Sequence, residues 1–238
     1  MNKDIVGSGD TLWWGQSQSL EKYETEKYNF LVTQKDYGED FARTKQIQRM
    51  TEGLGEVSVG FLNILSELKQ KDGFKVLDIG SGPGGVMTWF SMHGADVYGI
   101  DISDAFVDFA KGKFPSLEIF VGNANNMHMF DDNTFDLVCH LDGMEHIPEV
   151  WEEDCLKEAI RVSKKYIFYE NACEDSLADQ WTMEGNFTNA HINIKHPDEW
   201  LRFYEDNAKA LNYEIVHTHQ HTGINQHQAI ILKKTNDI

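Results

Sequence analysis

The chain has 238 residues, which is enough for one α/β domain with a substantial core and short for two. Its hydrophobic content of 41% and charged content of 25% are ordinary for a globular protein, and no apolar run approaches the roughly 18 residues of a membrane span. A membrane is therefore not an expected partner. The formal net charge of -18 repels polyanions, so a long nucleic acid is not an expected partner either.

The N-terminal residues Met1-Asn2-Lys3-Asp4 lack the basic start and apolar core of a signal peptide, and the cysteines have no metal-binding spacing. Both observations predict a cytoplasmic protein. Residues 1–40 are polar with scattered Trp and Tyr, which are costly to leave in water. This segment is interpreted either as a flexible arm or as a lid over a ligand site, and residues 41–238 as a single domain.

The domain is predicted to begin with a helix, since apolar residues recur at helical spacing between 43 and 69. An apolar run from Phe74 to Ile79 then predicts a short buried strand, and a helix-compatible stretch covers 86–92. Four glycines separate the strand from that helix: Gly80, Gly82, Gly84 and Gly85. A strand, glycine turn and helix in this order place bare backbone N–H groups and a positive helix end beside a ligand.

Asp78 lies two residues before the first glycine, at the carboxyl end of the predicted strand. A buried carboxylate there is costly without a partner. The ammonium group of a methionine moiety would supply that partner, whereas a pyrophosphate would be repelled. Asp78 therefore favours a cationic ligand over a dinucleotide.

Strands and helices alternate through the rest of the chain. Further strands are predicted at 95–100, 117–121, 135–141, 166–169, 213–219 and 227–232, and further helices at 104–113, 148–163 and 196–211. A long irregular connection covers 171–195. This order predicts an α/β fold: a Rossmann-like, mostly parallel, seven-stranded sheet with helices on both faces and an antiparallel C-terminal hairpin. Ligands bind such sheets at the carboxyl ends of the strands.

Asp101 ends the second strand, where a carboxylate can accept hydrogen bonds from both hydroxyls of a ribose. The stretch from 75 to 162 resembles the type-11 branch of the class I S-adenosylmethionine-dependent methyltransferases, and 76–85 resembles motif I of that class. The resemblance implies S-adenosylmethionine (SAM) as the cofactor. It implies that Asp78 and the glycine turn bind the methionine end and that Asp101 binds the ribose.

The resemblance also implies that Asn123 and Ala124, which follow the third strand, bind the adenine. The family usually has an aspartate where this chain has Asn123, but an amide oxygen also accepts a hydrogen bond. Ile102 and Leu141 complete the predicted cofactor contacts.

A cluster of polar residues follows the fourth strand. Asp142, Glu145 and His146 have the i, i+3, i+4 spacing that puts two carboxylates and an imidazole on one helical face. Small-RNA 2′-O-methyltransferases and ubiquinone-pathway O-methyltransferases have a similar Glu-x-x-Glu-His motif that binds a divalent metal. That resemblance implies a site for Mg or Mn, which His191 is placed in the chain to complete. A second interpretation is that Glu145-His146 only packs the turn.

His191 also begins a His-x-Asn-x-Lys pattern that, with Trp200, resembles a substrate-side stretch of small-molecule and sugar methyltransferases. A histidine there can take a proton from an attacking hydroxyl. His146 and His191 are therefore the candidate catalytic residues, either as bases or as metal ligands. By contrast, the alternating histidines at 217, 219 and 221 are interpreted as a solvated strand edge.

The function predicted is methyl transfer from SAM to a small-molecule acceptor, at a hydroxyl of a sugar, a phenol or a similar metabolite. The net charge of -18 favours a small acceptor over nucleic acid. Two alternatives stay open at this point. One is a metal-dependent nucleotide or RNA 2′-O-methyltransferase, and the other is a non-catalytic protein with a methyltransferase fold.

Overall fold

The computed structural model describes residues 58–173, 180–183, 186–189, 191–221 and 227–235. The predicted arm or lid, 1–40, lies outside the described residues, and so does the first part of the helix predicted at 43–69. Within the described residues that helix is α5 (Ser58–Leu68).

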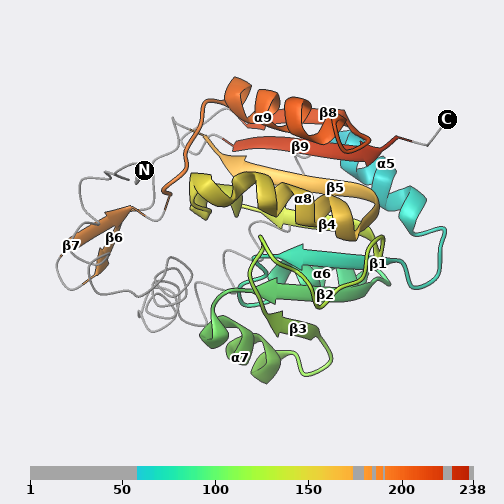
Figure 1. Cartoon of the computed structure of the whole chain (residues 1–238). Coiled ribbons are helices and arrows are strands. Elements are labelled where there is room, and N and C mark those ends of the chain that lie inside the picture. The colour runs from blue at the N-terminus through green and yellow to red at the C-terminus, as the bar shows by residue number, and fades with distance from the viewer. Residues whose placement is uncertain (1–57, 174–179, 184–185, 190, 222–226, 236–238) are drawn as a thin grey trace.

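A seven-stranded sheet forms the centre of the domain, in the order β3-β2-β1-β4-β5-β9-β8 (Figure 1). The strands β1 to β5 are mutually parallel, β9 is antiparallel to β5, and β8 is antiparallel to β9. This arrangement confirms the predicted fold class. The strand bounds are β1 (Lys75–Ile79), β2 (Asp96–Asp101), β3 (Glu118–Val121), β4 (Phe135–Leu141), β5 (Ser163–Ala172), β8 (Tyr213–His221) and β9 (His227–Lys234).

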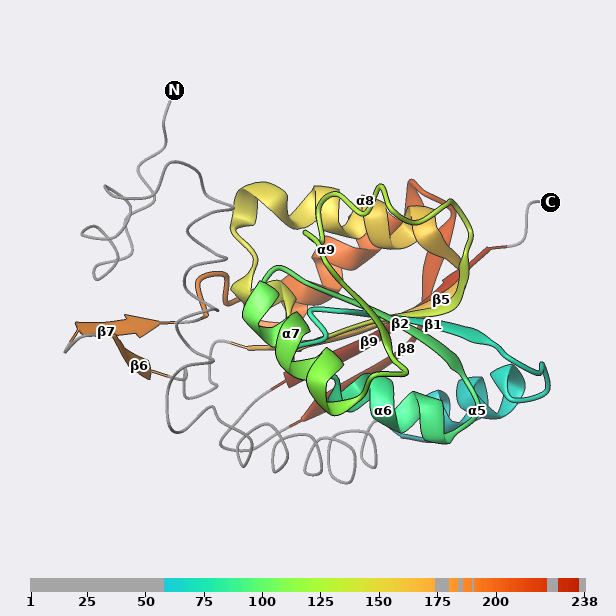
Figure 2. The same ribbon diagram turned by 90° about the horizontal axis from the view of Figure 1, so that it is seen from below.

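Helices cover both faces of the sheet (Figure 2). Side chains of α5, α6 (Gly85–Met92) and α7 (Asp104–Lys113) pack in one buried cluster, and those of α8 (Glu152–Val162) and α9 (Pro197–Lys209) pack in a second. Within the described ranges, no helix combines the length and the apolar character needed to cross a membrane.

The first strand shows why its sequence is almost continuously apolar. Leu77 and Ile79 belong to the cluster under α8 and α9, whereas Val76 belongs to the cluster under α6. Successive side chains of a strand point to opposite faces. A strand that is covered on both faces has no face in contact with water, so its sequence does not alternate apolar with polar residues. The same reasoning applies to β4, where every residue but Leu141 is buried.

Three elements differ from the sequence-based prediction. The fifth strand is longer than predicted at both ends, because Ser163 pairs with β4 and the pairing with β9 continues up to Ala172 and His227. The predicted irregular connection contains a two-stranded antiparallel pair, β6 (Gln180–Met183) and β7 (Asn186–Asn189). The helix predicted from residue 148 begins with a separate 3-10 turn, η4 (Glu149–Trp151).

Candidate active site

The carboxyl ends of the parallel strands lie along one edge of the sheet. Strand pairing aligns Ile79 of β1 with Ile100 of β2 and with His140 of β4, and it aligns Asp101 with Val121 of β3. The polar residues at these strand ends are therefore neighbours, although 20 to 61 residues separate the aligned positions in the chain. Asp78, one residue before the end of β1, is only 2% exposed.

The turn after β1 has the backbone conformation that the glycines predict. Gly80, Gly82 and Gly84 have φ angles of 66°, 49° and 86°, in the left-handed region that side chains with a Cβ rarely adopt. An added Cβ at Gly82 would meet no atom of the described residues within 4 Å. The turn thus leaves room for a ligand beside bare backbone and beside the N-terminus of α6.

Asp101 connects this turn to the next helix. Its Oδ2 accepts a hydrogen bond from the N–H of Gly82 at 2.8 Å, and its Oδ1 accepts one from the N–H of Ser103 at 2.8 Å. Ser103 in turn caps α7 through its side chain. A carboxylate has about four lone-pair positions, so each oxygen keeps one for a ligand hydroxyl. The sequence placed Asp101 at the site and missed that it also holds the glycine turn.

Burial raises the pKa of Asp101 to about 6, and the N–H groups of Ser103 and Gly82 partly offset that rise. A protonated Asp101 loses acceptor capacity for the ribose hydroxyls. Those hydroxyls would in turn favour the carboxylate, so binding releases a proton wherever the free protein is protonated.

We therefore expect the affinity for S-adenosylhomocysteine to rise about tenfold per pH unit below pH 6 and to level off above it. Calorimetric titrations between about pH 5 and 7.5 measure this, and Asp101→Asn is the matched variant that cannot titrate. If the pH slope persists unchanged in Asp101→Asn, it belongs to another titrating group.

The raised pKa of Asp101 has the opposite effect on the stability of the free protein. The free energy of unfolding falls as the pH rises through the window from 3.8 to about 6.

A cavity of about 320 Å³ lies next to the ends of β2 and β3. It is lined by two predicted cofactor residues, Ile102 and Asn123, and by residues that sequence reasoning did not select: Asp104, Val121, Gly122, Asn125, Asn126, His128 and Met129. The Oδ1 of Asn123 accepts a local hydrogen bond from the N–H of Asn125 at 3.3 Å. Ala124 is 8% exposed and packs in the core, so any ligand contact of this residue comes from its backbone.

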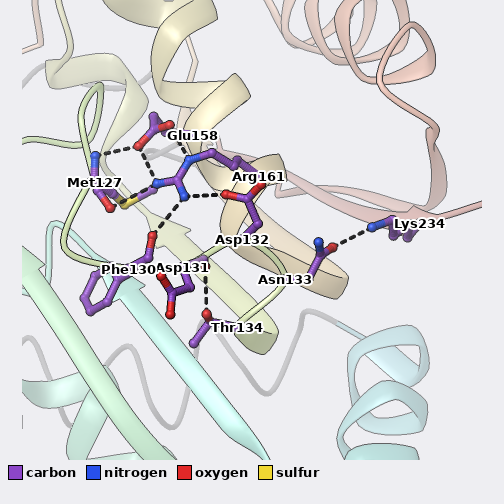
Figure 3. Close-up of polar contacts among 9 residues, drawn as sticks. All are labelled: Met127, Phe130, Asp131, Asp132, Asn133, Thr134, Glu158, Arg161 and Lys234. Carbon is purple, nitrogen blue, oxygen red and sulfur yellow. Dashed lines mark hydrogen bonds and ion pairs between the residues drawn. The ribbon is translucent and has the colours of Figure 1, made fainter.

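Arg161 of α8 holds the loop that follows this cavity (Figure 3). Its guanidinium donates to the backbone oxygens of Met127 and Phe130 at 3.0 and 2.8 Å, and it forms ion pairs with Glu158 and Asp132. Glu158 also accepts the N–H of Met127 at 2.6 Å. Asp132 of this loop and Glu158 of α8 thus have a structural role.

A second group of polar residues follows β4, at η3 (Met144–His146). Glu145 is fully buried, and its Oε1 accepts the N–H of Ala172 from the end of β5 at 3.2 Å. The backbone oxygen of Glu145 accepts the N–H groups of Ile192 and Asn193 at 2.9 and 3.0 Å. These bonds bring the segment that begins with His191 against η3.

Three of the four predicted metal ligands lie together. A ligand atom from each of Glu145, His146 and His191 lies within 4.8 Å of the other two. Asp142 is outside this group. Its Oδ1 lies 3.1 Å from the Nε2 of His227, at the start of β9. Asp142 also has a φ of 47°, so the chain turns sharply between β4 and η3.

The rest of the His-x-Asn-x-Lys pattern supports the position of His191. The Nδ2 of Asn193 donates to the backbone oxygen of Met144 at 3.4 Å, and Lys195 forms a 2.7 Å ion pair with Glu152 of α8. Trp200 is buried and donates to the backbone oxygen of Ala172 at 3.1 Å. Only His191 of this pattern lies with the other candidate catalytic residue, His146, at 4.8 Å between ring centroids.

His140, at the end of β4, is a site neighbour that sequence reasoning did not select. Burial lowers its pKa to about 4, so the imidazole is neutral at physiological pH. A Cβ added at Gly143 would lie 2.0 Å from its Nε2, and one added at Gly80 would lie 3.8 Å from it. The ring therefore fills the space between the glycine turn and the turn that leads to η3.

The strand order, the glycine turn after β1, the acidic end of β2 and the cavity beside β3 define a class I methyltransferase fold. Residues 76–166 match the family model of the methyltransferase domain. Residues 76–166 therefore carry a methyltransferase domain, in agreement with the resemblance that the sequence predicted.

Known proteins with similar sequences cover parts of the chain. The chain is 34% identical to 24-methylenesterol C-methyltransferase 2 of Arabidopsis thaliana in an alignment that covers 63% of this chain and 44% of that protein. It is 34% identical to the phosphoethanolamine N-methyltransferase of Plasmodium falciparum in an alignment that covers 35% of this chain and 33% of that protein. The chain thus spans less than half the length of these relatives.

A solved structure matches nearly the whole fold. The magnesium protoporphyrin IX methyltransferase of Synechocystis PCC 6803, solved with bound SAM, superposes with a TM-score of 0.63. The match covers 92% of this chain and 99% of that chain at 16% sequence identity. At this identity the likeness establishes the fold.

Proposed function

We propose that the protein transfers a methyl group from SAM to a hydroxyl group of a small-molecule acceptor. The observation that carries the proposal is a row of groups along one edge of the sheet that are complementary to the parts of SAM. A buried carboxylate, an open glycine turn, a second carboxylate and a cavity follow one another in the order β1, β2, β3. Acid and imidazole side chains lie on the other side, after β4.

The residues present fit the cofactor. Asp78 would hold the ammonium of the methionine moiety, since a cation offsets the cost of its buried charge. Asp101 would accept the ribose hydroxyls, and the cavity lined by Ile102 and Asn123 would take the adenine. When bound, SAM supplies an electrophilic methyl group on a positively charged sulfur. The acceptor oxygen bonds to the methyl carbon while the sulfur keeps the electron pair of the broken bond.

Methyl transfer of this kind needs alignment of the two reactants and exclusion of water more than it needs a covalent step by the protein. An acceptor hydroxyl must also lose its proton. His146 and His191 lie at the acceptor side of the strand ends, where an imidazole can take that proton near neutral pH. This requirement supports a hydroxyl acceptor, because a neutral amine already presents a lone pair.

The names of the relatives include both a C- and an N-methyltransferase, so the acceptor atom has to be tested. Formation of S-adenosylhomocysteine should be measured with matched acceptors that differ only in carrying a hydroxyl or an amine, such as a phenol and the corresponding aniline. We expect turnover with the hydroxyl series and a marked loss of that turnover in His191→Gln. Turnover with amines alone would overturn O-methylation, and cofactor binding without any turnover would favour the non-catalytic alternative.

A further inference from the structure

We propose that Glu145, His146 and His191 form a binding site for a divalent transition-metal ion. We further infer, resting on the proposed function, that the acceptor hydroxyl binds to this ion. The proposed site narrows the predicted four-ligand set to three residues. Of the two predicted metals, Mg and Mn, it keeps Mn, which accepts nitrogen ligands.

The three side chains already lie near coordination distance. Their ligand atoms are all within 4.8 Å of one another. Metal–ligand bonds of about 2.1 Å in tetrahedral geometry put ligand atoms roughly 3.4 Å apart. The longest of the three separations therefore has to shorten by up to about 1.4 Å, which rotation of the His146 and His191 rings can supply because both are only partly buried.

The backbone around the site is fixed by bonds that do not use the imidazole groups. The backbone oxygen of Glu145 accepts two N–H groups from the segment after His191, and Asn193 is bonded to the backbone oxygen of Met144. The N–H of Ala172 holds one carboxylate oxygen of Glu145. Hydrogen bonds of this kind, from groups that do not touch the metal, orient ligands and raise metal affinity.

The neighbouring carboxylates have other partners. Asp142 pairs with His227 and Glu152 with Lys195, so the donor set consists of two imidazoles and one carboxylate. This combination suits Zn²⁺, Fe²⁺, Mn²⁺ and Co²⁺, whereas Mg²⁺ and Ca²⁺ prefer oxygen ligands alone. The net charge of -18 attracts any cation, so selectivity has to come from the nitrogen donors.

Three protein ligands leave coordination positions open for an acceptor. With the ion bound, His146 and His191 act as ligands instead of as bases. A hydroxyl bound to a divalent ion loses its proton to solvent more readily, because the ion stabilises the oxygen anion. An acceptor with a second oxygen next to the reacting one, such as a catechol or a vicinal diol, would occupy two open positions. The site thus selects chelating hydroxyl compounds as the acceptor class.

The experiment titrates the full chain, stripped of metal, with Mn²⁺, Zn²⁺ or Mg²⁺ alone, by calorimetry and, for Mn²⁺, by electron paramagnetic resonance. We expect one saturable site for Mn²⁺ and Zn²⁺ and much weaker binding of Mg²⁺. His191→Gln and Glu145→Gln should each weaken Mn²⁺ binding by about tenfold or more, whereas Asp142→Asn and the β8 variant His217→Gln should leave it unchanged. Circular dichroism checks that each variant is folded.

Absence of saturable Mn²⁺ and Zn²⁺ binding, or binding that His191→Gln does not weaken, would overturn the site. Equal binding of Mg²⁺, or weakening by Asp142→Asn, would overturn the ligand set. Turnover with S-adenosylmethionine in the presence of a chelator separates the two proposals. Undiminished turnover would refute the metal-bound acceptor alone, whereas metal binding without any binding of S-adenosylhomocysteine would refute the proposed function alone.

Discussion

Replacement of Asp78 by asparagine is expected to weaken S-adenosylhomocysteine binding by about 2–5 kcal/mol, because it removes one partner of a buried charge pair. Asp78 is 2% exposed at the end of β1, so water screens its charge poorly. Burial and the charge of Asp78 together raise the pKa of the Cys139 thiol on the adjacent strand β4. Asparagine keeps the shape of the side chain, and calorimetry with the folded variant measures the loss.

A second ligand makes this test specific. The compound 5′-methylthioadenosine has the adenine, the ribose and the sulfur but lacks the amino acid. The Asp78→Asn change should leave its affinity unchanged, and the difference between the two ligands isolates the interaction of Asp78 with the amino acid. Equal losses for both ligands would show that Asp78 supports the site without binding the ammonium.

Replacement of Arg161 by leucine is expected to lower the free energy of unfolding by about 2–4 kcal/mol. Arg161 is 28% exposed at its side chain and Glu158 is 19% exposed, so both are partly shielded from water. The variant would leave Glu158 and the backbone oxygens of Met127 and Phe130 without their donor. Denaturant unfolding followed by circular dichroism measures the change.

The same helix offers the control. Lys157 forms ion pairs with Glu153 and Asp154, but these side chains are more than half exposed, so Lys157→Leu should leave the unfolding midpoint unchanged. The hydrogen bond from Arg161 is the main cause that holds the pKa of Glu158 below its ordinary value. The stabilisation is therefore present above pH 4.5 and is lost as the pH falls further, so the two curves should converge in acid. Equal stability of Arg161→Leu and wild type near neutral pH would contradict this account.

The fold was predictable where local patterns and long-range packing agree. The glycine turn, the alternation of strands with helices and the apolar run of β1 all indicate the same α/β sheet. The predicted bounds were too short at β5, whose C-terminal end, Glu170 to Ala172, pairs with β9. No pattern within residues 163–172 reveals that pairing partner, since β9 lies some 60 residues later in the chain.

The candidate site was predictable to the level of strand ends. Asp78 and Asp101 lie at the ends of β1 and β2 and Asn123 follows β3, as expected, because parallel strands bring their carboxyl ends to one edge. The roles of Arg161 and His140 depend on contacts across the fold, which spacing along the chain does not encode. The spacing of Asp142 and Glu145 predicted that both lie on one helical face. They do not, because the chain turns at Asp142 before the 3-10 helix begins.

Calorimetric titration of the full chain with S-adenosylhomocysteine tests the central claim most directly, since it asks whether the row of groups after β1, β2 and β3 is a cofactor site. We expect one site with a Kd on the order of micromolar. The same titration should show the pH dependence of the affinity and the loss of affinity in Asp78→Asn. Absence of binding at about millimolar ligand would contradict the central claim, because that corresponds to less than half of the expected binding free energy.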